Sequence, residues 1–570
     1  MKSDCNILGI TSPMSWDSSA CILKSGQLFA AAEEEKIIRI KHAPHHEPIN
    51  SIDFCLKTSN LSMKDIDCIA TAYMSNEEYL VRRFLYGLKY LSIDDLLAPY
   101  YYFKNSEHFK KLNSWNILNK NKNKLINVEH HLAHSFHSFS SSEFEKALVI
   151  SLDGEGETVS GLISVFYRRG FQILHRIPLK YSLGSMYESF TDFIGYSSHY
   201  DEGKVMGLSS YGTANDTIVN DLVKSDQKCT FRIATRKINK YLKNKFEHLI
   251  LNEGFICDEL HKTSMANFAA TAQNIYEVIL LSMAEYWILK TKISNVCLAG
   301  GCSLNCLANG KLLLNPQVSS VFVPPGSNDA GTSIGAGVYA YFLNSDEIPY
   351  VDHESANGHI YSENEILQCL NKHNLKFSKF SNTIDFIARV LADGKNVGWF
   401  QGGIEFGPRA LGYRSILSSA DTNSGKDELN YIKGREKWRP FGCIILENKI
   451  AEYFEINTER LPDLRYMNVA LPVRKNKAKQ IPAVVHVDNT SRIQSVTESE
   501  KELNNLLKKY YEITGIPLLI NTSFNTRGEP IVNTPNEAIV AFKTLNLDYL
   551  IMNDILVSRP NCNVLENKEV

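Results

Sequence analysis

The sequence predicts an α/β protein with more than one domain. Short apolar runs of strand length end in glycine-bearing turns, and longer segments with helical periodicity lie between them. With 570 residues, the chain is too long for one ordinary hydrophobic core, and domain sizes suggest roughly two to four units. The content of 44% hydrophobic and 22% charged residues is ordinary for a globular protein.

Four apolar runs in the first part of the chain each lead a loop to the expected edge of a sheet, where α/β folds often bind phosphates. They are Ile7–Ile10, Ala147–Leu152, Val296–Ala299 and Val321–Val323. A long helix is expected over Met265–Lys290 because this segment is largely apolar and contains neither glycine nor proline.

A polar stretch with few apolar residues, Phe342–Ser362, predicts a boundary between domains. The domains would then span residues 1–350 and 360–570. Strands near Asn396–Phe400 and Ile516–Ile520 indicate that the second domain is also α/β.

The charge balance and the chain start exclude several classes of protein. A net charge of −2 lacks the basic excess of a general nucleic-acid binder. Met1–Ile10 has no basic region before an apolar one, as a signal peptide would. No apolar run approaches the roughly 20 residues that span a bilayer. We therefore expect a cytoplasmic protein without nucleic-acid or membrane partners.

The 12 cysteines are scattered without a disulfide framework and are expected to be reduced thiols. Cys302 and Cys306 could share one face of a helix and bind a metal. Small buried residues are the better interpretation, because no second Cys/His pair stands at the spacing of a zinc site.

Three histidines within five residues form the first motif with chemical potential, Glu129–His134. His130 and His134 are four residues apart and would share one face of a helix, a common half-site for a divalent metal. Asp153, at the end of the next strand, could add an oxygen ligand. Exposed or capping histidines are the alternative. His131 would point elsewhere, behind the ligands or towards a substrate.

Three glycine-rich turns could pass close to a phosphate and offer it backbone N–H groups. The candidate nucleotide contacts in these turns are Gly154, Gly156, Gly300, Gly301, Asn305 and Asn328. Asp329 is a candidate for the last metal ligand or for a nucleotide contact. The simpler alternative is that Asn328 or Asp329 only caps the following helix.

Cations in the second half of the chain stand among glycines, prolines, serines and aromatic residues. Three segments carry them, Glu405–Ser415, Arg435–Pro440 and Asn521–Gly528, together with Arg492. The planar fork of arginine fits phosphate and carbamoyl oxygens. A solvated charge run would be rich in Lys and Glu without glycine, so the pattern favours an anion pocket over solvated surface.

The motifs occur in an order that resembles a known family. Along the chain they are the histidine cluster, LDGEGE, GGCSLN, NDAGTSIGAG, EFGPRALGYRSI, REKWRPFG and NTSFNTRGEP. The sequence resembles the NodU/CmcH-type O-carbamoyltransferases over essentially its whole length, from Asp17–Ala20 to Pro530. These motifs are specific for the family and do not identify the acceptor.

The resemblance implies an amino-terminal, duplicated α/β domain of the actin-like ATPase superfamily, followed by a YrdC-like α/β domain. The second domain would join carbamoyl phosphate and ATP into a carbamoyl-adenylate. The first would then move the carbamoyl group to a hydroxyl of a small-molecule natural product or sugar. The implied cofactor is a divalent metal, Fe(II) in the first place with Mg²⁺ as an alternative, and ATP is the cosubstrate. The oligomeric state stays open.

The resemblance also implies three groups of site residues at matching positions. The metal ligands would be His130, His134, Asp153 and Asp329. The contacts to carbamoyl phosphate would be Arg414, Lys437, Arg492, Asn521 and Ser523, with Met467 and Arg527 as neighbours. The candidate catalytic residues are Asp17, Lys41 and His131.

One position departs from the family pattern, which has His-Asp before Ser-Ser-Ala where this chain has Trp16 and Asp17. The role of that histidine would be vacant or taken by His42 or His131, or the change marks a different acceptor.

The alternatives to O-carbamoyl transfer are N-carbamoyl transfer, tRNA threonylcarbamoyl-type transfer, metal-dependent hydrolysis and non-catalytic nucleotide binding. The near-neutral charge disfavours tRNA, and the cationic second half disfavours a hydrolase.

Overall fold

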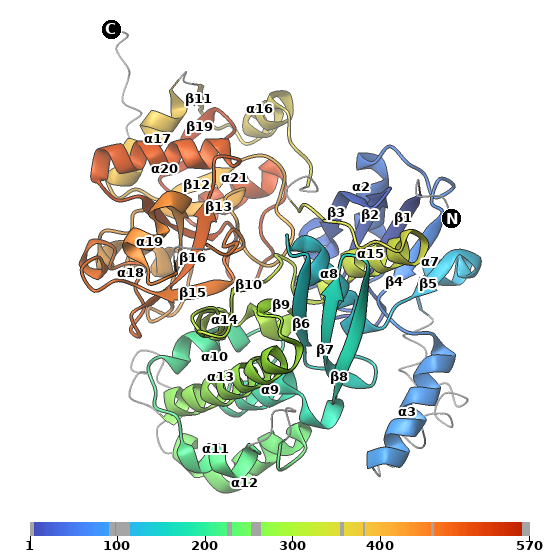
Figure 1. Cartoon of the computed structure of the whole chain (residues 1–570). Helices are drawn as coiled ribbons and strands as arrows, with labels where there is room; N and C mark the ends of the chain where they lie inside the picture. The colour runs from blue at the N-terminus through green and yellow to red at the C-terminus, as the bar shows by residue number, and fades with distance from the viewer. Residues whose placement is uncertain are drawn as a thin grey trace. The chain divides into compact units, whose positions relative to one another are not determined.

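The computed structural model describes residues 5–90, 97, 114–224, 231–251, 264–353, 358–379, 382–457 and 461–560. The chain divides into two compact units, Met1–Ala356 and Asn357–Val570. Each unit consists of β-sheets with helices packed on them (Figure 1), which confirms the predicted α/β class.

Unit 1 contains two five-stranded sheets. The first consists of β1 (Asn6–Ile10), β2 (Ser19–Lys24), β3 (Gln27–Glu33), β4 (Cys68–Thr71) and β5 (Leu125–Asn127). The second consists of β6 (Lys146–Leu152), β7 (Val159–Tyr167), β8 (Gly170–Pro178), β9 (Asn295–Ala299) and β10 (Ser320–Phe322). The four strands expected in this half of the chain correspond to β1, β6, β9 and β10.

The two sheets share one topology. Their strand orders are β3-β2-β1-β4-β5 and β8-β7-β6-β9-β10. In each sheet the first three strands form an antiparallel meander. The fourth strand runs parallel to the first, and the fifth runs parallel to the fourth. This repetition confirms that the amino-terminal α/β domain is duplicated.

Two buried helices, α8 (His130–Ser141) and α15 (Thr332–Ser345), lie against each other between the sheets (Figure 1). Helix α15 packs on β1, β2 and β4, and α8 packs on β6, β7 and β9. The two backbones approach closely at Gly335, where a Cβ atom would lie 1.8 Å from the carbonyl oxygen of Ala133. The helix pair therefore joins the two halves of unit 1.

The described part of unit 1 contains ten further α-helices besides this pair. They are α1 (Glu34–Ile38), α2 (Ile49–Thr58), α3 (Asn76–Tyr90), α7 (Asn116–Lys120), α9 (Leu183–Phe193), α10 (Glu202–Ser209), α11 (Asp216–Leu222), α12 (Ile238–Leu251), α13 (Ser264–Thr291) and α14 (Cys306–Leu313). Helix α13 is the long helix that the sequence predicts over Met265–Lys290.

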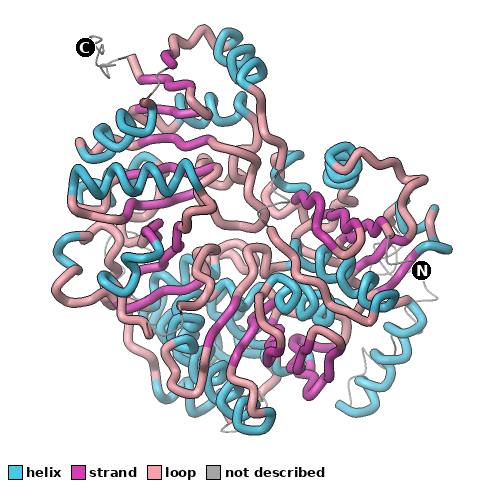
Figure 2. The backbone as a smooth tube through the Cα atoms, turned by 45° about the horizontal axis from the view of Figure 1, so that its top comes forward, coloured by secondary structure: helices cyan, strands magenta, loops and turns pink. Residues whose placement is uncertain are grey.

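Unit 2 is built on one nine-stranded mixed sheet, seen as a stack of strands in Figure 2. Its strands are β11 (Ser378–Lys379), β12 (Val397–Phe400), β13 (Arg414–Ser418), β14 (Gly442–Leu446), β15 (Val469–Pro472), β16 (Thr490–Val496), β17 (Leu518–Ser523), β18 (Tyr549–Met552) and β19 (Ile555–Ser558). The strand order is β11-β19-β18-β12-β13-β17-β14-β16-β15.

Helices pack along this sheet. They are α16 (Glu363–Lys372), α17 (Thr383–Ala392), α18 (Asn423–Ile432), α19 (Ile450–Tyr453), α20 (Lys501–Thr514) and α21 (Pro535–Thr544). Helix α20 packs on β14, β17 and α17, while α21 packs on β12, β18 and α16. The expected strands near residues 396–400 and 516–520 correspond to β12 and β17.

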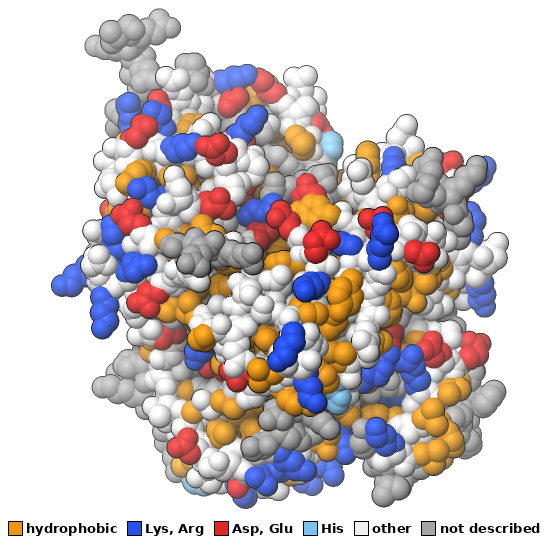
Figure 3. All heavy atoms as spheres, in the orientation of Figure 1, with side chains coloured by type: hydrophobic (Ala, Val, Ile, Leu, Met, Phe, Trp, Pro, Cys, Tyr) orange, Lys and Arg blue, Asp and Glu red, His pale blue; other side chains and the backbone are white. Residues whose placement is uncertain are grey.

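The surface charges, the helix lengths and the cysteines show no special feature in the described part of the chain. Acidic and basic side chains are interspersed over the face shown in Figure 3. Within the described ranges, no helix has both the length and the apolar character that crossing a bilayer requires. The cysteines in the described part of the chain are free thiols, Cys302 and Cys306 included.

Candidate active site

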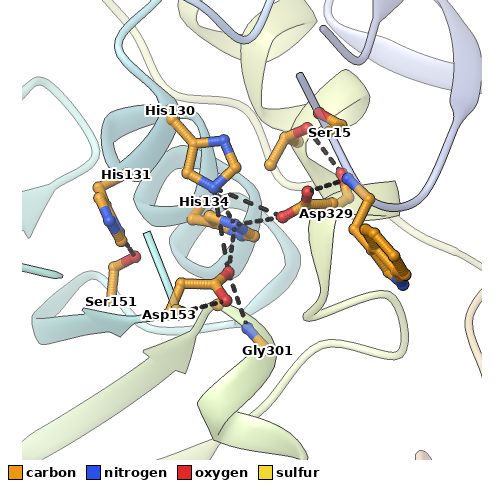
Figure 4. A network of polar contacts seen from close by, with 12 residues as sticks. Ser15, His130, His131, His134, Ser151, Asp153, Gly301 and Asp329 are labelled. Atoms are coloured by element: carbon orange, nitrogen blue, oxygen red, sulfur yellow. Dashed lines mark hydrogen bonds and ion pairs between the residues drawn. The ribbon is translucent and has the colours of Figure 1, made fainter. Parts of the chain in front are cut away.

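Four predicted ligands meet in unit 1, at the point where α8, β6 and α15 converge (Figure 4). His130 and His134 lie in the first turns of α8, and Asp153 follows β6. Asp329 begins a short 3-10 helix, η6 (Asp329–Gly331), directly before α15. One ligand atom from each side chain lies within 4.8 Å of the others.

The distances fit coordination of one ion. The Nε2 atoms of His130 and His134 are 3.1 Å apart. Nε2 of His134 lies 3.2 Å from Oδ2 of Asp153 and 3.6 Å from Oδ1 of Asp329. Ligand atoms about 2.1 Å from one ion are about 3.0 to 3.4 Å apart in neighbouring positions. Imidazole with carboxylate suits iron, manganese or zinc, so these residues fit a divalent ion.

The electrostatics of the cluster also favour positive charge. Burial lowers the pKa of His130, but the carboxylates of Asp329 and Asp153 raise it to about 9. Burial raises the pKa of Asp153, and contacts to the two histidines hold it well below its usual range. Without a cation, the cluster therefore binds a proton at neutral pH, and a divalent ion satisfies the same carboxylates.

Backbone N–H groups orient both carboxylates. Trp16 donates its backbone N–H to Oδ2 of Asp329 at 2.7 Å. Gly301 donates to Oδ2 of Asp153 at 3.0 Å, and Gly154 donates to Oδ1 of Asp153 at 2.8 Å (Figure 4). These bonds hold the carboxylate oxygens towards the imidazoles.

The carboxylate of Glu157 caps the helix that carries the two histidines. It accepts the backbone N–H groups of His130 and Met74, each at 3.0 Å. Burial raises the pKa of Glu157 to about 7, although His130 opposes the rise. The sequence did not indicate this cap, because nothing near residue 157 in the sequence places it against α8.

The glycines predicted as nucleotide contacts have structural partners of their own. Besides the bonds of Gly154 and Gly301 to Asp153, Gly156 donates to the carbonyl of Val159 at 2.8 Å. Gly300 has φ 83°, and a Cβ atom there would lie 2.1 Å from the carbonyl oxygen of Leu152. Their contact with a nucleotide therefore stays a prediction.

The two asparagines predicted for the same role differ. Asn305 caps α14 by accepting the N–H of Ala308 and exchanges hydrogen bonds with Gln273. The side-chain oxygen of Asn328 is buried, and no described residue donates to it. Asn328 therefore has the freer acceptor for a ligand.

The candidate catalytic residues have different surroundings. Both ring nitrogens of His131 are engaged, with Oγ of Ser151 at 3.0 Å and the carbonyl of Val159 at 3.1 Å. Lys41 donates to both oxygens of Glu35 at 3.1 Å. These contacts favour a packing role for His131 and a loop-fixing role for Lys41.

Asp17 is engaged by a residue that the sequence offered only as an alternative. Oδ1 of Asp17 lies 2.7 Å from Nδ1 of His42. Burial raises the pKa of Asp17, and His42 opposes this shift. The buried carboxylate of Asp17 therefore holds the imidazole of His42 in place.

Unit 2 contains a separate cluster of partly buried cations at the ends of its strands. Arg492 on β16 lies beside Gly442, where β14 begins, and Arg435 and Arg439 belong to the loop that leads into β14. Burial lowers the pKa of Arg435, and the guanidinium groups of Arg439 and Arg492 lower it further, to about 9. Cations packed so closely favour an anion between them.

Lys433 belongs to this cluster although the sequence did not indicate it. Its Nζ donates to the carbonyl of Ser523 and, at 3.1 Å, to Oδ1 of Asn525. Burial holds the pKa of Lys433 well below its usual range, and Arg435 and Arg439 add to this effect. The predicted Lys437, four residues later, is exposed.

Arg414 and Asn521 are mainly bound to the protein itself. Arg414 is fully buried and donates to the carbonyls of Gln401, at 2.7 Å, and Gly402, at 3.0 Å. Asn521 donates to the carbonyl of Ala410 at 3.0 Å. The buried Oδ1 of Asn521 receives no hydrogen bond from any described residue.

The remaining predicted contacts surround the cations. Ser523 donates to Oδ1 of Asn525 at 2.6 Å. Arg527 is 65% exposed and donates to the carbonyl of Gly434 at 2.9 Å. Met467 has φ 54°, and its sulfur lies beside Gly442. The structure thus places Met467 and Ser523 next to the cluster that contains Arg492, while the role of these three residues in binding carbamoyl phosphate stays a prediction.

Fold and site together define a protein with a duplicated α/β unit that holds a ligand cluster and a second α/β unit that holds a cluster of cations. The chain belongs to the carbamoyltransferase family. The family model Carbamoyltransferase N-terminus matches residues 6–338, and Carbamoyltransferase C-terminus matches residues 388–559. The protein is therefore an enzyme that transfers carbamoyl groups.

Similar proteins agree with this family. Nodulation protein NolNO of Sinorhizobium fredii is 32% identical over 97% of this chain and 80% of that protein. Nodulation protein U of Azorhizobium caulinodans is 36% identical over 41% of this chain and 40% of that protein. The crystal structure of HypF from T. kodakarensis aligns with 62% of this chain and 49% of the HypF chain, at 14% sequence identity and a TM-score of 0.34. This TM-score is too low to support a structural comparison.

Proposed function

We propose that this carbamoyltransferase is ATP-dependent and moves the carbamoyl group of carbamoyl phosphate, through a carbamoyl-adenylate, to a hydroxyl of a small-molecule natural product or sugar. The observation that carries the proposal is the separation of two chemistries within one chain. Unit 1 holds the imidazole–carboxylate cluster, and unit 2 holds the cluster of partly buried cations. The resemblance to NodU/CmcH-type O-carbamoyltransferases supports the choice of a hydroxyl acceptor.

The chemistry of unit 2 suits carbamoyl phosphate. Its phosphate oxygens would be held by Arg435, Arg439 and Arg492, which neutralise the charge that develops at phosphorus. Its amino group is a hydrogen-bond donor that inorganic phosphate lacks. Oδ1 of Asn521 is a buried acceptor opposite Gly442 in the sheet, and no described residue donates to it. This pairing would separate carbamoyl phosphate from phosphate alone.

Activation of the carbamoyl group would proceed in two steps in this unit. Water cleaves carbamoyl phosphate to carbamate and phosphate. A carbamate oxygen then attacks the α-phosphorus of ATP, and the electron pair of the breaking P–O bond leaves with pyrophosphate. The product, a carbamoyl-adenylate, carries AMP as a good leaving group.

Transfer would take place in unit 1. His130, His134, Asp153 and Asp329 would hold a divalent ion, which when bound supplies Lewis acidity towards a substrate oxygen. The N–H groups of Trp16 and Gly301 keep the two carboxylates in place. The acceptor oxygen forms the new bond to the carbamoyl carbon, AMP departs with the bonding electron pair, and a nearby imidazole or carboxylate takes the hydroxyl proton.

The test separates the two half-reactions in the full-length protein. With carbamoyl phosphate and ATP, the wild type should release pyrophosphate, and hydroxylated acceptors should gain the mass of one carbamoyl group. Arg492→Ala should abolish both reactions. His130→Ala should retain pyrophosphate release and lose transfer. Lys475→Ala, a change at an exposed cation of unit 2, should retain both. Loss of pyrophosphate release in folded His130→Ala would contradict this division of labour.

The same assay separates the alternatives. Carbamoylation of amines but not of hydroxyls would favour N-carbamoyl transfer, and activity confined to tRNA would favour a threonylcarbamoyl-type transferase. Water as the only acceptor, without ATP dependence, would favour a hydrolase. Nucleotide binding without pyrophosphate release would favour a non-catalytic role for this member of the family.

A further inference from the structure

The loop after α1 holds its backbone in a strained conformation. Arg39, His42, Ala43 and His45 have φ of 61°, 64°, 46° and 62°. Positive φ costs non-glycine residues roughly 1 kcal/mol each, and such residues gather at functional sites. The loop is fixed by Glu35, which accepts the backbone N–H of His42 at 2.5 Å as well as the Lys41 ammonium group. The chain therefore holds His42 in one position at an energetic cost.

The imidazole of His42 is arranged as a base. Nδ1 lies 2.7 Å from Oδ1 of Asp17, and the two side chains are 18% and 11% exposed. Because the carboxylate accepts a hydrogen bond from Nδ1–H, the neutral ring carries its free lone pair on Nε2. No described residue forms a hydrogen bond to Nε2. The ring centroid lies 5.3 Å from that of Tyr200, which is itself 52% exposed.

This pair lies beside the ligand cluster. Asp17 directly follows Trp16, whose backbone N–H is bonded to Asp329. The resemblance to the NodU/CmcH-type family implies histidine at position 16. Here the indole ring stacks on His199 with centroids 4.4 Å apart, so residue 16 offers no imidazole. Nε2 of His42 is thus a basic nitrogen near the ligand cluster, and no described residue forms a hydrogen bond to it.

We propose that His42 is the catalytic base of carbamoyl transfer and that Asp17 is its positioning residue. The inference rests on the proposed function. Nε2 of His42 accepts the proton of the acceptor hydroxyl while the hydroxyl oxygen forms the C–O bond to the carbamoyl carbon. The electron pair of the breaking bond leaves with AMP, and the imidazolium later loses its proton to solvent. Asp17 fixes the tautomer and stabilises the imidazolium.

The charged groups around the ring set the pH range of this base. Burial lowers the pKa of His42, and Asp17 raises it more strongly than burial lowers it. Lys41 lowers the pKa and Glu35 raises it. Because the base must be neutral, the rate should rise with pH, with a midpoint above the ordinary imidazole value of about 6.5.

The experiment measures kcat for carbamoyl transfer from pH 5.5 to 9 with the full-length, metal-loaded enzyme and a hydroxylated acceptor. His42→Gln should lower kcat by about 100-fold or more and remove the rise with pH. Asp17→Asn should lower kcat and move the midpoint to lower pH, because the carboxylate that raises the pKa is gone. His46→Gln, an exposed imidazole of the same loop, should match the wild type.

The inference is overturned if folded His42→Gln keeps the wild-type rate or its pH dependence. If His42→Gln does not fold, Asp17→Asn decides, and an unmoved midpoint in that variant refutes the assignment. Failure of the proposed function looks different, because the wild type would then carbamoylate no hydroxyl at any pH.

Discussion

The packing of α8 on α15 makes the ligand cluster depend on one glycine. Helix α8 carries both imidazoles, and Asp329 stands directly before α15. A Cβ atom at Gly335 would lie 1.8 Å from the carbonyl oxygen of Ala133. Ordinary contacts between carbon and oxygen are about 3.3 Å, so Gly335→Ala must move the helices apart by about 1.5 Å. Both colliding groups are backbone or Cβ atoms, so no side chain can rotate away.

Such a shift exceeds what coordination tolerates. Metal–ligand distances vary by about 0.2 Å, so Asp329 would lose contact with an ion held by the two histidines. We expect Gly335→Ala to weaken binding of a divalent ion by roughly 100-fold and to lower the free energy of unfolding by about 1 to 3 kcal/mol. Equilibrium dialysis against buffered Fe²⁺ or Zn²⁺ with elemental analysis measures the first effect, and urea denaturation measures the second.

A matched glycine provides the control. Gly203 lies on α10, and an added Cβ there would meet nothing within 4 Å. Gly203→Ala should leave metal affinity unchanged and stabilise the chain by up to about 1 kcal/mol, as alanine does in a helix. Equal metal affinity in Gly335→Ala and Gly203→Ala would falsify the claim that the helix contact sets the geometry of the cluster.

Three further outcomes are expected. Inorganic phosphate should raise the Tm of the wild type, by the equivalent of about 2.7 kcal/mol at a hundred times its Kd, and Arg492→Ala should remove this rise. Arg414→Ala should lower the free energy of unfolding by about 2 to 4 kcal/mol in urea, because two partly buried carbonyls lose their donor. In the metal-free chain, Glu157 has a pKa of about 7 instead of 4.5. Its contribution to stability is therefore full below pH 4.5 and is lost as pH rises to about 7, by about 3 kcal/mol; Glu157→Gln should lack this fall in urea titrations.

The sequence predicted those elements and residue positions that depend on local periodicity and spacing. The strands now seen as β1, β6, β9 and β10 are apolar runs that end in turns, and α13 is a long apolar segment without a breaker. His130 and His134 share a helix face because α8 forms where the four-residue spacing predicts it. The identical topology of the two sheets was available only through the family resemblance, because β5 and β10 have three residues each and leave almost no pattern.

What the sequence left open depends on contacts between distant residues. Asp17 and His42 are 25 positions apart, and the loop after α1 that carries His42 turns through positive φ at non-glycine residues, which no turn signal marks. Lys433 and Lys437 stand four positions apart in one cationic segment, and only the path of the loop into β14 buries the first and exposes the second. Burial of a single cation is a tertiary property, so composition could not distinguish them.

Trp16 stands at the position where the resemblance to the NodU/CmcH-type family implies histidine. Its contribution to the cluster is the backbone N–H that binds Asp329 at 2.7 Å, and any residue except proline can make this bond. The side chain at position 16 is therefore free to change while the ligand stays oriented. In the mechanism proposed above, proton transfer uses another imidazole nearby, and the fixed loop around His42 offers one that Asp17 already holds. A Trp16→His variant in the His42→Gln background should therefore recover part of the lost kcat, since it returns an imidazole beside the cluster, whereas Trp16→Phe in that background should recover none.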